Sequence, residues 1–155
     1  MEKLIREISN GNNLALISTR RMGKSGLIEH WFRNESIVRL YYTFFVDIYA
    51  IASLRDFVFL LSKVILEGLK PRGKRTLQRF RNTLKSIQAG MSFDVSGNPS
   101  FHLQLGDIKS EEITLDEIFR YLNEAGKPCI VAIDEFQQIA GYPEKNAEAL
   151  LRTYI

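Results

Sequence analysis

The fold prediction depends most on residues 14–26, which read Leu14-Ala15-Leu16-Ile17-Ser18-Thr19-Arg20-Arg21-Met22-Gly23-Lys24-Ser25-Gly26. An apolar run comes first and a helical pattern follows, which is the setting in which the motif G-x-x-x-x-G-K-[ST] binds phosphates. Ser18 stands where the motif has its first glycine. Serine tolerates an unusual backbone conformation less readily than glycine. Because a bare G-K-S sequence often occurs by chance, an ordinary strand-to-helix turn is the alternative interpretation.

Residues 18–26 are the predicted nucleotide-binding residues. Backbone N–H groups of such a loop converge on the phosphates, and the N-terminus of the next helix adds the positive end of its dipole. Lys24 would neutralise the β and γ oxygens, and Ser25 would reach a magnesium ion. The full predicted set for ATP is Ser18, Thr19, Arg20, Arg21, Met22, Gly23, Lys24, Ser25 and Gly26. The motif alone leaves GTP open as the ligand.

A second motif follows the apolar run at residues 129–133, which is typical of a strand buried on both faces. It ends in Asp134 and Glu135. Open α/β sheets bind ligands at the carboxyl ends of their strands, where the Gly23–Ser25 loop is also expected. Asp134 would hold Mg²⁺ directly or through water, and Glu135 would deprotonate the attacking water. The alternative is that Asp134 caps a helix and Glu135 is solvated.

Composition places the chain among ordinary globular domains. It has 155 residues, of which 45% are hydrophobic and 25% charged, so about one domain is expected. The single cysteine, Cys129, excludes an internal disulfide framework and favours a reducing compartment. The first residues lack a signal-peptide pattern, and no apolar run reaches about 18 residues. A cytoplasmic protein without membrane contact is therefore expected.

Charge is distributed unevenly, although the net charge is only +3. No acidic residue lies between Glu67 and Asp94, and the basic residues in that interval are Lys70, Arg72, Lys74, Arg75, Arg79, Arg81 and Lys85. Residues 70–85 could contact nucleic-acid phosphates or an acidic protein. A solvated helix face is the alternative.

Periodicity predicts alternating helices and strands, hence an α/β fold. Ser53 with Asp56 and Thr114 with Glu117 resemble helix-starting capping boxes. The predicted strands cover 13–17, 38–49 and 129–133, with a β-hairpin inserted at 91–105. The predicted helices lie around 4–8, 27–32, 53–68, 76–88, 114–126 and 144–155.

The motifs at 16–25, Phe44-Phe45-Val46-Asp47 and 130–137 together resemble the archaeal-type ATPase family of P-loop NTPases, near the AAA and STAND groups. Arg20, Arg21, Gly23 and Lys24 match that family's phosphate loop, whereas Ser18 and Thr19 depart from it. The resemblance implies a three-layer P-loop fold with a mostly parallel sheet. It also implies that Asp134 is the Walker B aspartate, that Glu135 is the catalytic glutamate, and that Arg20 and Arg21 line the phosphate pocket or face a neighbouring protomer.

The resemblance further implies that residues 1–155 are a partial ATPase domain, incomplete at the C-terminus. The family's strand order is 5-1-4-3-2, so its sensor strand would lie between strands 13–17 and 129–133. The resemblance thus implies that this sequence lacks the family's sensor strand, its lid and its following domain. Because buried unpaired backbone is costly, we expect another copy, a second chain or direct pairing of the two strands to fill the slot. A homo-oligomer or strand exchange would satisfy this expectation.

The leading functional hypothesis is Mg-dependent ATP binding and hydrolysis that drives a conformational switch. One alternative is a nucleotide-binding switch without useful turnover. Another is a nucleic-acid-binding module that uses residues 70–85.

Overall fold

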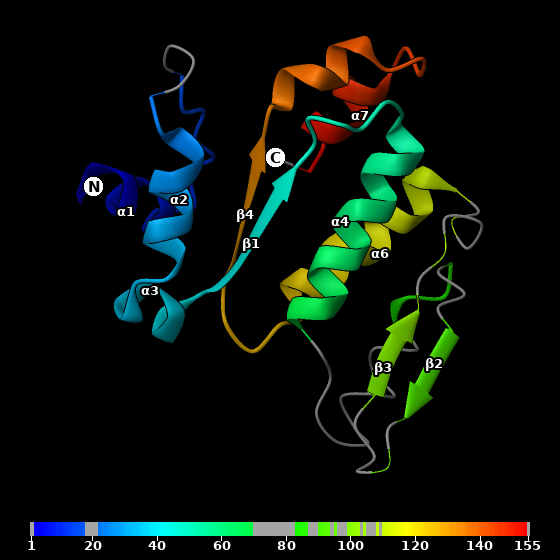
Figure 1. The fold of residues 1–155 in the computed structure, drawn as a ribbon, viewed down its shortest axis with the longest axis horizontal. Coiled ribbons are helices and arrows are strands. Elements are labelled where there is room, and N and C mark those ends of the chain that lie inside the picture. The colour runs from blue at the N-terminus through cyan, green and yellow to red at the C-terminus, as the bar shows by residue number, and fades with distance from the viewer. Residues whose placement is uncertain are drawn as a thin grey trace.

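The structure is a computed structural model that describes residues 2–17, 22–69, 83–86, 90–93, 95, 99–102, 104, 108 and 110–154. Figure 1 shows the order of its elements. They are α1 (Glu2–Ser9), α2 (Lys24–Phe32), α3 (Glu35–Leu40), β1 (Tyr42–Asp47), α4 (Leu54–Gly68), β2 (Gly90–Phe93), β3 (Pro99–His102), α6 (Glu111–Asn123), β4 (Cys129–Asp134), the 3-10 helix η2 (Phe136–Gly141) and α7 (Ala147–Arg152).

Two parallel strands, β1 and β4, form the central sheet of the described residues. Their register runs from Tyr42 opposite Cys129 to Asp47 opposite Asp134. Parallel neighbours need a long crossover connection, and α4 and α6 lie within the connection here. Because the strands are parallel and in register, both end in an aspartate at the same edge of the sheet.

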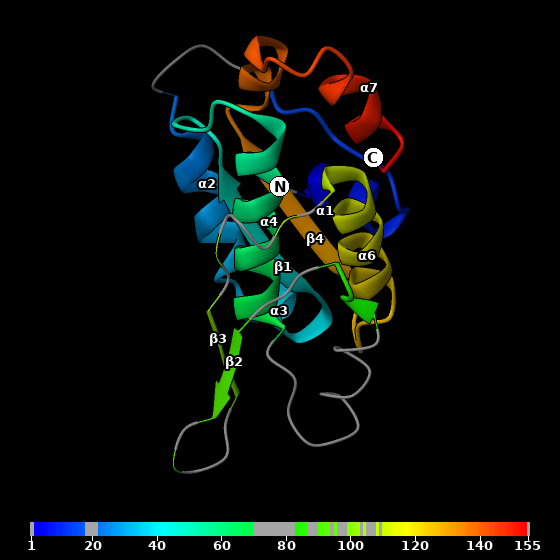
Figure 2. The ribbon, with the colours of Figure 1, turned by 90° about the vertical axis from the view of Figure 1, so that its right-hand side faces the viewer.

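Helices pack against both faces of this sheet. Phe44 and Val46 of β1 point into the larger core with α4 and α6, whereas Phe45 packs in a second cluster with Trp31 and Phe32 of α2. This alternation follows from the two-residue period of a strand. Figures 1 and 2 show α1, α2 and α3 on one side of β1 and β4, and α4 and α6 on the other. The chain is therefore a mixed α/β structure.

The predicted strand over 38–49 is wrong at its beginning, because residues 38–40 belong to α3. The Asn34 side chain caps that helix by accepting a hydrogen bond from the N–H of Ser36 at 2.9 Å. The cap predicted at Ser53 is confirmed: its hydroxyl accepts the N–H of Asp56 at 3.1 Å. Side-chain caps of this kind satisfy N–H groups that have no partner within the helix.

The capping box predicted at Thr114 and Glu117 is wrong. Helix α6 begins earlier, at Glu111, and Ser110 is its N-cap. Thr114 and Glu117 are both buried within the helix. The Glu117 carboxylate accepts the N–H of Ser86 at 2.9 Å and its hydroxyl at 2.7 Å. These two polar residues therefore hold another segment of the chain and do not begin the helix.

The strand predicted at 13–17 does not form. Residues 13–17 have no regular secondary structure, and Leu14, Leu16 and Ile17 are 43%, 45% and 94% exposed. A strand is stabilised by a neighbouring strand, and among the described residues β4 pairs only with β1. All six residues of β4 are only half-buried, although both faces of the strand contact helices. Their remaining exposure therefore lies along the edge of β4 that faces away from β1.

The predicted slot between strands at 13–17 and 129–133 consequently does not arise, because residues 13–17 form no strand. The inserted hairpin is confirmed, with β2 and β3 antiparallel and Gly90 opposite His102. The C-terminal helix is shorter than expected, since α7 covers only Ala147–Arg152. Most of the predicted basic helix at 76–88 lies outside the described residues.

Candidate active site

Helix α2 begins at the candidate phosphate-binding residues. Gly23, its N-cap, has φ 72° and ψ 24°, the left-handed region that residues with a Cβ adopt at a cost. Apart from its two chain neighbours, no atom of the described residues lies within 4 Å of the position that a Cβ would take there. Glycine is therefore required at this position by backbone conformation and not by space. Lys24 is the first residue of the helix, as the motif predicts.

The N-terminus of α2 differs from those of α4 and α6. Each of those two helices has a serine that caps it through its side chain and an acidic residue in the first turn. Helix α2 has neither a side-chain cap nor an acidic residue in its first turn, and its first residue is a lysine. Because a helix N-terminus carries positive partial charge, this end of α2 favours an anion.

Ser25 and Asp134 meet although they lie far apart in the sequence. The Ser25 hydroxyl donates a hydrogen bond to Oδ2 of Asp134 at the end of β4, and both residues are half-buried. Ser25 lies in the first turn of α2, so this hydrogen bond joins the helix to the edge of the sheet. The structure thus brings together two residues that the sequence predicts as ligands of one magnesium ion.

The other carboxylate oxygen of Asp134 is also engaged. Its Oδ1 accepts the N–H of Glu135 at 3.0 Å, so both oxygens have fixed directions. Glu135 itself has φ 58°, which is uncommon for a residue with a side chain. Its Oε2 accepts a hydrogen bond from the Gln137 side chain. The backbone thus changes direction at Glu135, immediately after β4 ends at Asp134.

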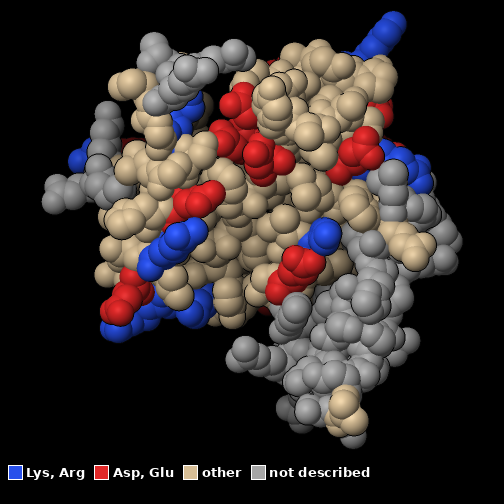
Figure 3. Space-filling view, in the orientation of Figure 1, with Lys and Arg blue, Asp and Glu red and all other residues tan. Residues whose placement is uncertain are grey.

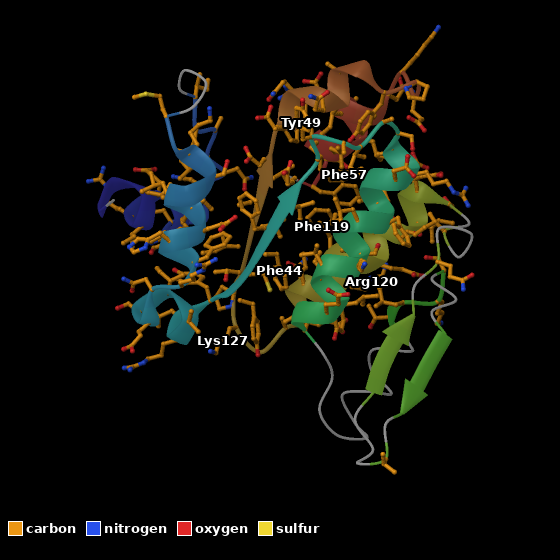
Figure 4. All side chains as sticks on the ribbon, viewed as in Figure 1. Phe44, Tyr49, Phe57, Phe119, Arg120 and Lys127 are labelled. Carbon is orange, nitrogen blue, oxygen red and sulfur yellow. The ribbon has the colours of Figure 1, made fainter. Side chains whose placement is uncertain are left out.

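Asp47 is a third acidic residue at this edge, and the predicted site did not include it. The register places it directly opposite Asp134, and its Oδ1 accepts the N–H of Tyr49 at 2.9 Å. Tyr49, labelled in Figure 4, lies just beyond the end of β1 and is 68% exposed. Figure 3 shows acidic side chains gathered near the carboxyl ends of the two strands. The available signal was an aspartate ending an apolar run, as Asp134 does.

The remaining predicted residues are placed only in part. Ser18, Thr19, Arg20 and Arg21 lie outside the described residues. Met22 is 70% exposed. Gly26 is exposed on α2, and beyond its own helix no atom of the described residues lies within 4 Å of the position that a Cβ would take. The structure therefore brings together Gly23, Lys24, Ser25 and Asp134, followed by Glu135, where one end of α2 faces one edge of the sheet.

The donor set at this edge consists of oxygen atoms, which suit Mg²⁺, Ca²⁺ and Mn²⁺. A hydroxyl and carboxylates are oxygen ligands, and Mg²⁺ is bound through one or two carboxylates together with substrate phosphates and waters. In the part of the chain that the structure describes, no three His, Cys, Asp or Glu residues form a metal cluster. The hydroxyl and carboxylates at the site are compatible with Mg²⁺ that is also bound by phosphate and water.

Comparisons with protein-family models, with curated proteins and with solved structures found no match to this chain.

Within the described residues, no helix is both long enough and apolar enough to cross a lipid bilayer.

Proposed function

We propose that this chain binds ATP with Mg²⁺ and hydrolyses it as a P-loop ATPase module of the archaeal type, and that hydrolysis drives a conformational switch. The observation that carries the proposal is the hydrogen bond from Ser25 to Asp134. In such a module the hydroxyl after the phosphate-loop lysine and the carboxylate after a buried strand serve the same ion. The α/β arrangement would then belong to a three-layer P-loop fold.

The phosphates would lie against the first turn of α2. The N–H groups of that turn have no intrahelical acceptor, since the helical pattern starts with Leu27 donating to Gly23 at 2.9 Å. A cation at a helix N-terminus is unfavourable by a few tenths of a kcal/mol or more. A phosphate beside Lys24 would reverse that penalty and accept hydrogen bonds from the same turn.

Ser25 and Asp134 would hold the magnesium ion, directly or through water. When bound, the ion supplies positive charge that offsets the charge on the phosphate oxygens. Asp134 contributes more than charge, because its hydrogen bond to the Glu135 N–H fixes the carboxylate plane. Ser25 is fixed by its place in the first turn of α2. Both groups are thus oriented before a ligand arrives.

Glu135 would accept the proton of the attacking water. Its backbone turns at φ 58° immediately after β4, which directs its side chain away from the regular path of the strand. The hydrogen bond from Gln137 holds the carboxylate. A carboxylate held next to the metal ligand can orient a water molecule for in-line attack on the γ-phosphate.

One observation favours the alternative of a nucleotide-binding switch without useful turnover. Residues 13–17, which lead into the phosphate loop, form no strand and are exposed. Catalysis depends on positioning to within a fraction of an ångström, whereas binding tolerates a loosely held loop. The third candidate, nucleic-acid binding through residues 70–85, concerns a segment that lies almost entirely outside the described residues.

The proposal is tested by titrating a fluorescent ATP analogue with Mg²⁺ into the wild type and the variants Lys24→Ala and Lys63→Ala. Lys63 is an exposed lysine on α4 and serves as the matched control. Loss of one charge-assisted contact to phosphate should weaken affinity about tenfold or more, and only in Lys24→Ala. Equal affinity of all three proteins would remove Lys24 from the site.

Turnover is tested separately with Glu135→Gln, which keeps the shape of the side chain but cannot accept a proton. Phosphate release should stop while the analogue still binds with wild-type affinity. If the wild type binds ATP but releases no phosphate, the switch without turnover is the correct function. Undiminished phosphate release by Glu135→Gln would exclude Glu135 as the base.

A further inference from the structure

Asp47 and Asp134 lie side by side on the same face of the sheet. They are opposite each other in the parallel register, and neighbouring strands lie about 4.8 Å apart. Side chains alternate between faces along a strand. Phe45 of β1 and Ala132 of β4 both pack against the cluster that contains Trp31 and Phe32 of α2. Asp47 and Asp134, two residues further along each strand, therefore face α2 as well, where Ser25 lies.

The backbone at this edge is held by further hydrogen bonds. The N–H of Ile48 donates to the carbonyl of Asp134 at 3.3 Å, so pairing between the strands continues up to their last residues. The Oδ1 atom of Asp47 accepts the Tyr49 N–H, which fixes the side chain at the end of β1. Among the described residues, the other oxygen of Asp47 accepts no hydrogen bond, whereas both oxygens of Asp134 do.

We propose that Asp47 is a positioning residue for magnesium in this site, acting through metal-bound water. The inference rests on the proposed nucleotide-binding function. Mg²⁺ loses its waters reluctantly and keeps several of them when bound, and those waters need hydrogen-bond acceptors. Asp47 is exposed at the end of β1, and it offers a second carboxylate oxygen beside Asp134, on the face of the sheet that meets Ser25. Outer groups of this kind orient the ligands of a metal and raise its affinity.

The same charge has an opposite effect on nucleotide without metal. A carboxylate near the phosphate site repels a polyanion, so Asp47 disfavours free ATP and favours ATP with Mg²⁺. Asp47 thereby makes binding depend on the metal. A residue that only shapes the turn at Tyr49 would affect both forms of the ligand in the same direction.

The test compares the wild type with Asp47→Asn, Asp47→Ala and the control Asp116→Asn, an exposed aspartate on α6. Asparagine keeps the oxygen that accepts the Tyr49 N–H but removes the charge. Two quantities are measured: the affinity for a fluorescent ATP analogue in EDTA, and the affinity of the nucleotide-loaded protein for Mn²⁺, followed by electron paramagnetic resonance.

We expect Asp47→Asn to bind Mn²⁺ about tenfold more weakly while its affinity for the analogue in EDTA is unchanged or higher. Asp116→Asn should match the wild type in both measurements. If Asp47→Asn binds Mn²⁺ as the wild type does and only Asp47→Ala is impaired, Asp47 acts through the turn and the inference is overturned. If the wild type binds no nucleotide in either condition, the proposed function itself fails.

Discussion

The hydrogen bond between Ser25 and Asp134 can be measured as a coupling free energy without any ligand. The perturbation is a double-mutant cycle of Ser25→Ala, Asp134→Ala and the double variant, unfolded with urea in the presence of EDTA. Asp134 also accepts the Glu135 N–H, but that loss occurs in both Asp134 variants and cancels in the cycle. The coupling therefore isolates the contact between the two side chains.

The size of the coupling follows from the chemistry and the burial. A hydrogen bond to a charged group contributes about 1.5–3 kcal/mol net. Both residues here are only half-buried, so competition with water places the coupling at about 1–1.5 kcal/mol. For a chain of this length Ser25→Ala alone should lower the melting temperature by about 3–5 °C.

The control pairs Ser25→Ala with Asp116→Ala. Asp116 accepts a hydroxyl hydrogen bond from Tyr154 at 2.6 Å, which is the same chemistry on the opposite side of the sheet. These two substitutions should add to within about 0.5 kcal/mol. A coupling between Ser25 and Asp134 no larger than that of the control would refute the contact, and with it the joining of α2 to the sheet edge.

Three further predictions concern the fold. A Cβ on Gly68 would lie 2.6 Å from the Phe44 ring, so Gly68→Ala should lower the free energy of unfolding by about 1–2 kcal/mol. Gly26 has open space around it, so Gly26→Ala should raise the free energy of unfolding by about 0.5–1 kcal/mol. Urea titrations that give the same sign for both variants would contradict this prediction. Burial raises the pKa of the Cys129 thiol to about 11. It also raises the pKa values of three tyrosines, Tyr121, Tyr142 and Tyr154, to about 12. Above about pH 9 the folded state then binds more protons than the unfolded state, so the free energy of unfolding should fall between about pH 9 and 12. A melting temperature that stays constant over this pH range would contradict the raised pKa values of the thiol and the tyrosines. Successive amides of an edge strand point alternately toward the neighbouring strand and toward the open edge. Hydrogen exchange along residues 129–134 should therefore alternate between slow and fast. Uniformly slow exchange would mean that a further strand covers the outer edge of β4.

Local sequence signals located most elements but not their exact roles. The apolar run that becomes β4 and the Ser53 cap were predictable because each depends on neighbouring residues alone. The pattern at Thr114 and Glu117 matches a cap as well as Ser110 does. The structure distinguishes the two patterns, because Ser110 caps α6 whereas Glu117 accepts a hydrogen bond from Ser86, 31 residues away in the chain. A tertiary contact of that kind leaves no mark in a local pattern.

The strand predicted at 13–17 fails for a related reason. Its residues are as apolar as those of β4, but a strand needs a partner, and pairing is not encoded in one segment. By contrast, the sequence indicated that Ser25 and Asp134 lie at the same edge of the sheet, because each follows an apolar run. The structure places the two side chains in contact. The position of Asp47 beside Asp134 required the register of two strands more than 80 residues apart in the chain. The catalytic and metal-binding roles of these residues stay predictions.

The central claim is that a nucleotide binds where the start of α2 meets the carboxyl edge of β1 and β4, and amide NMR tests it most directly. We expect ATP with Mg²⁺ to shift the backbone amides of Gly23, Lys24, Ser25, Asp134 and Glu135 in a saturable way. The amides of α6 should remain unchanged, because that helix lies on the other face of the sheet. Saturable shifts that avoid these five amides, or no shifts at millimolar ATP with Mg²⁺, would contradict the claim.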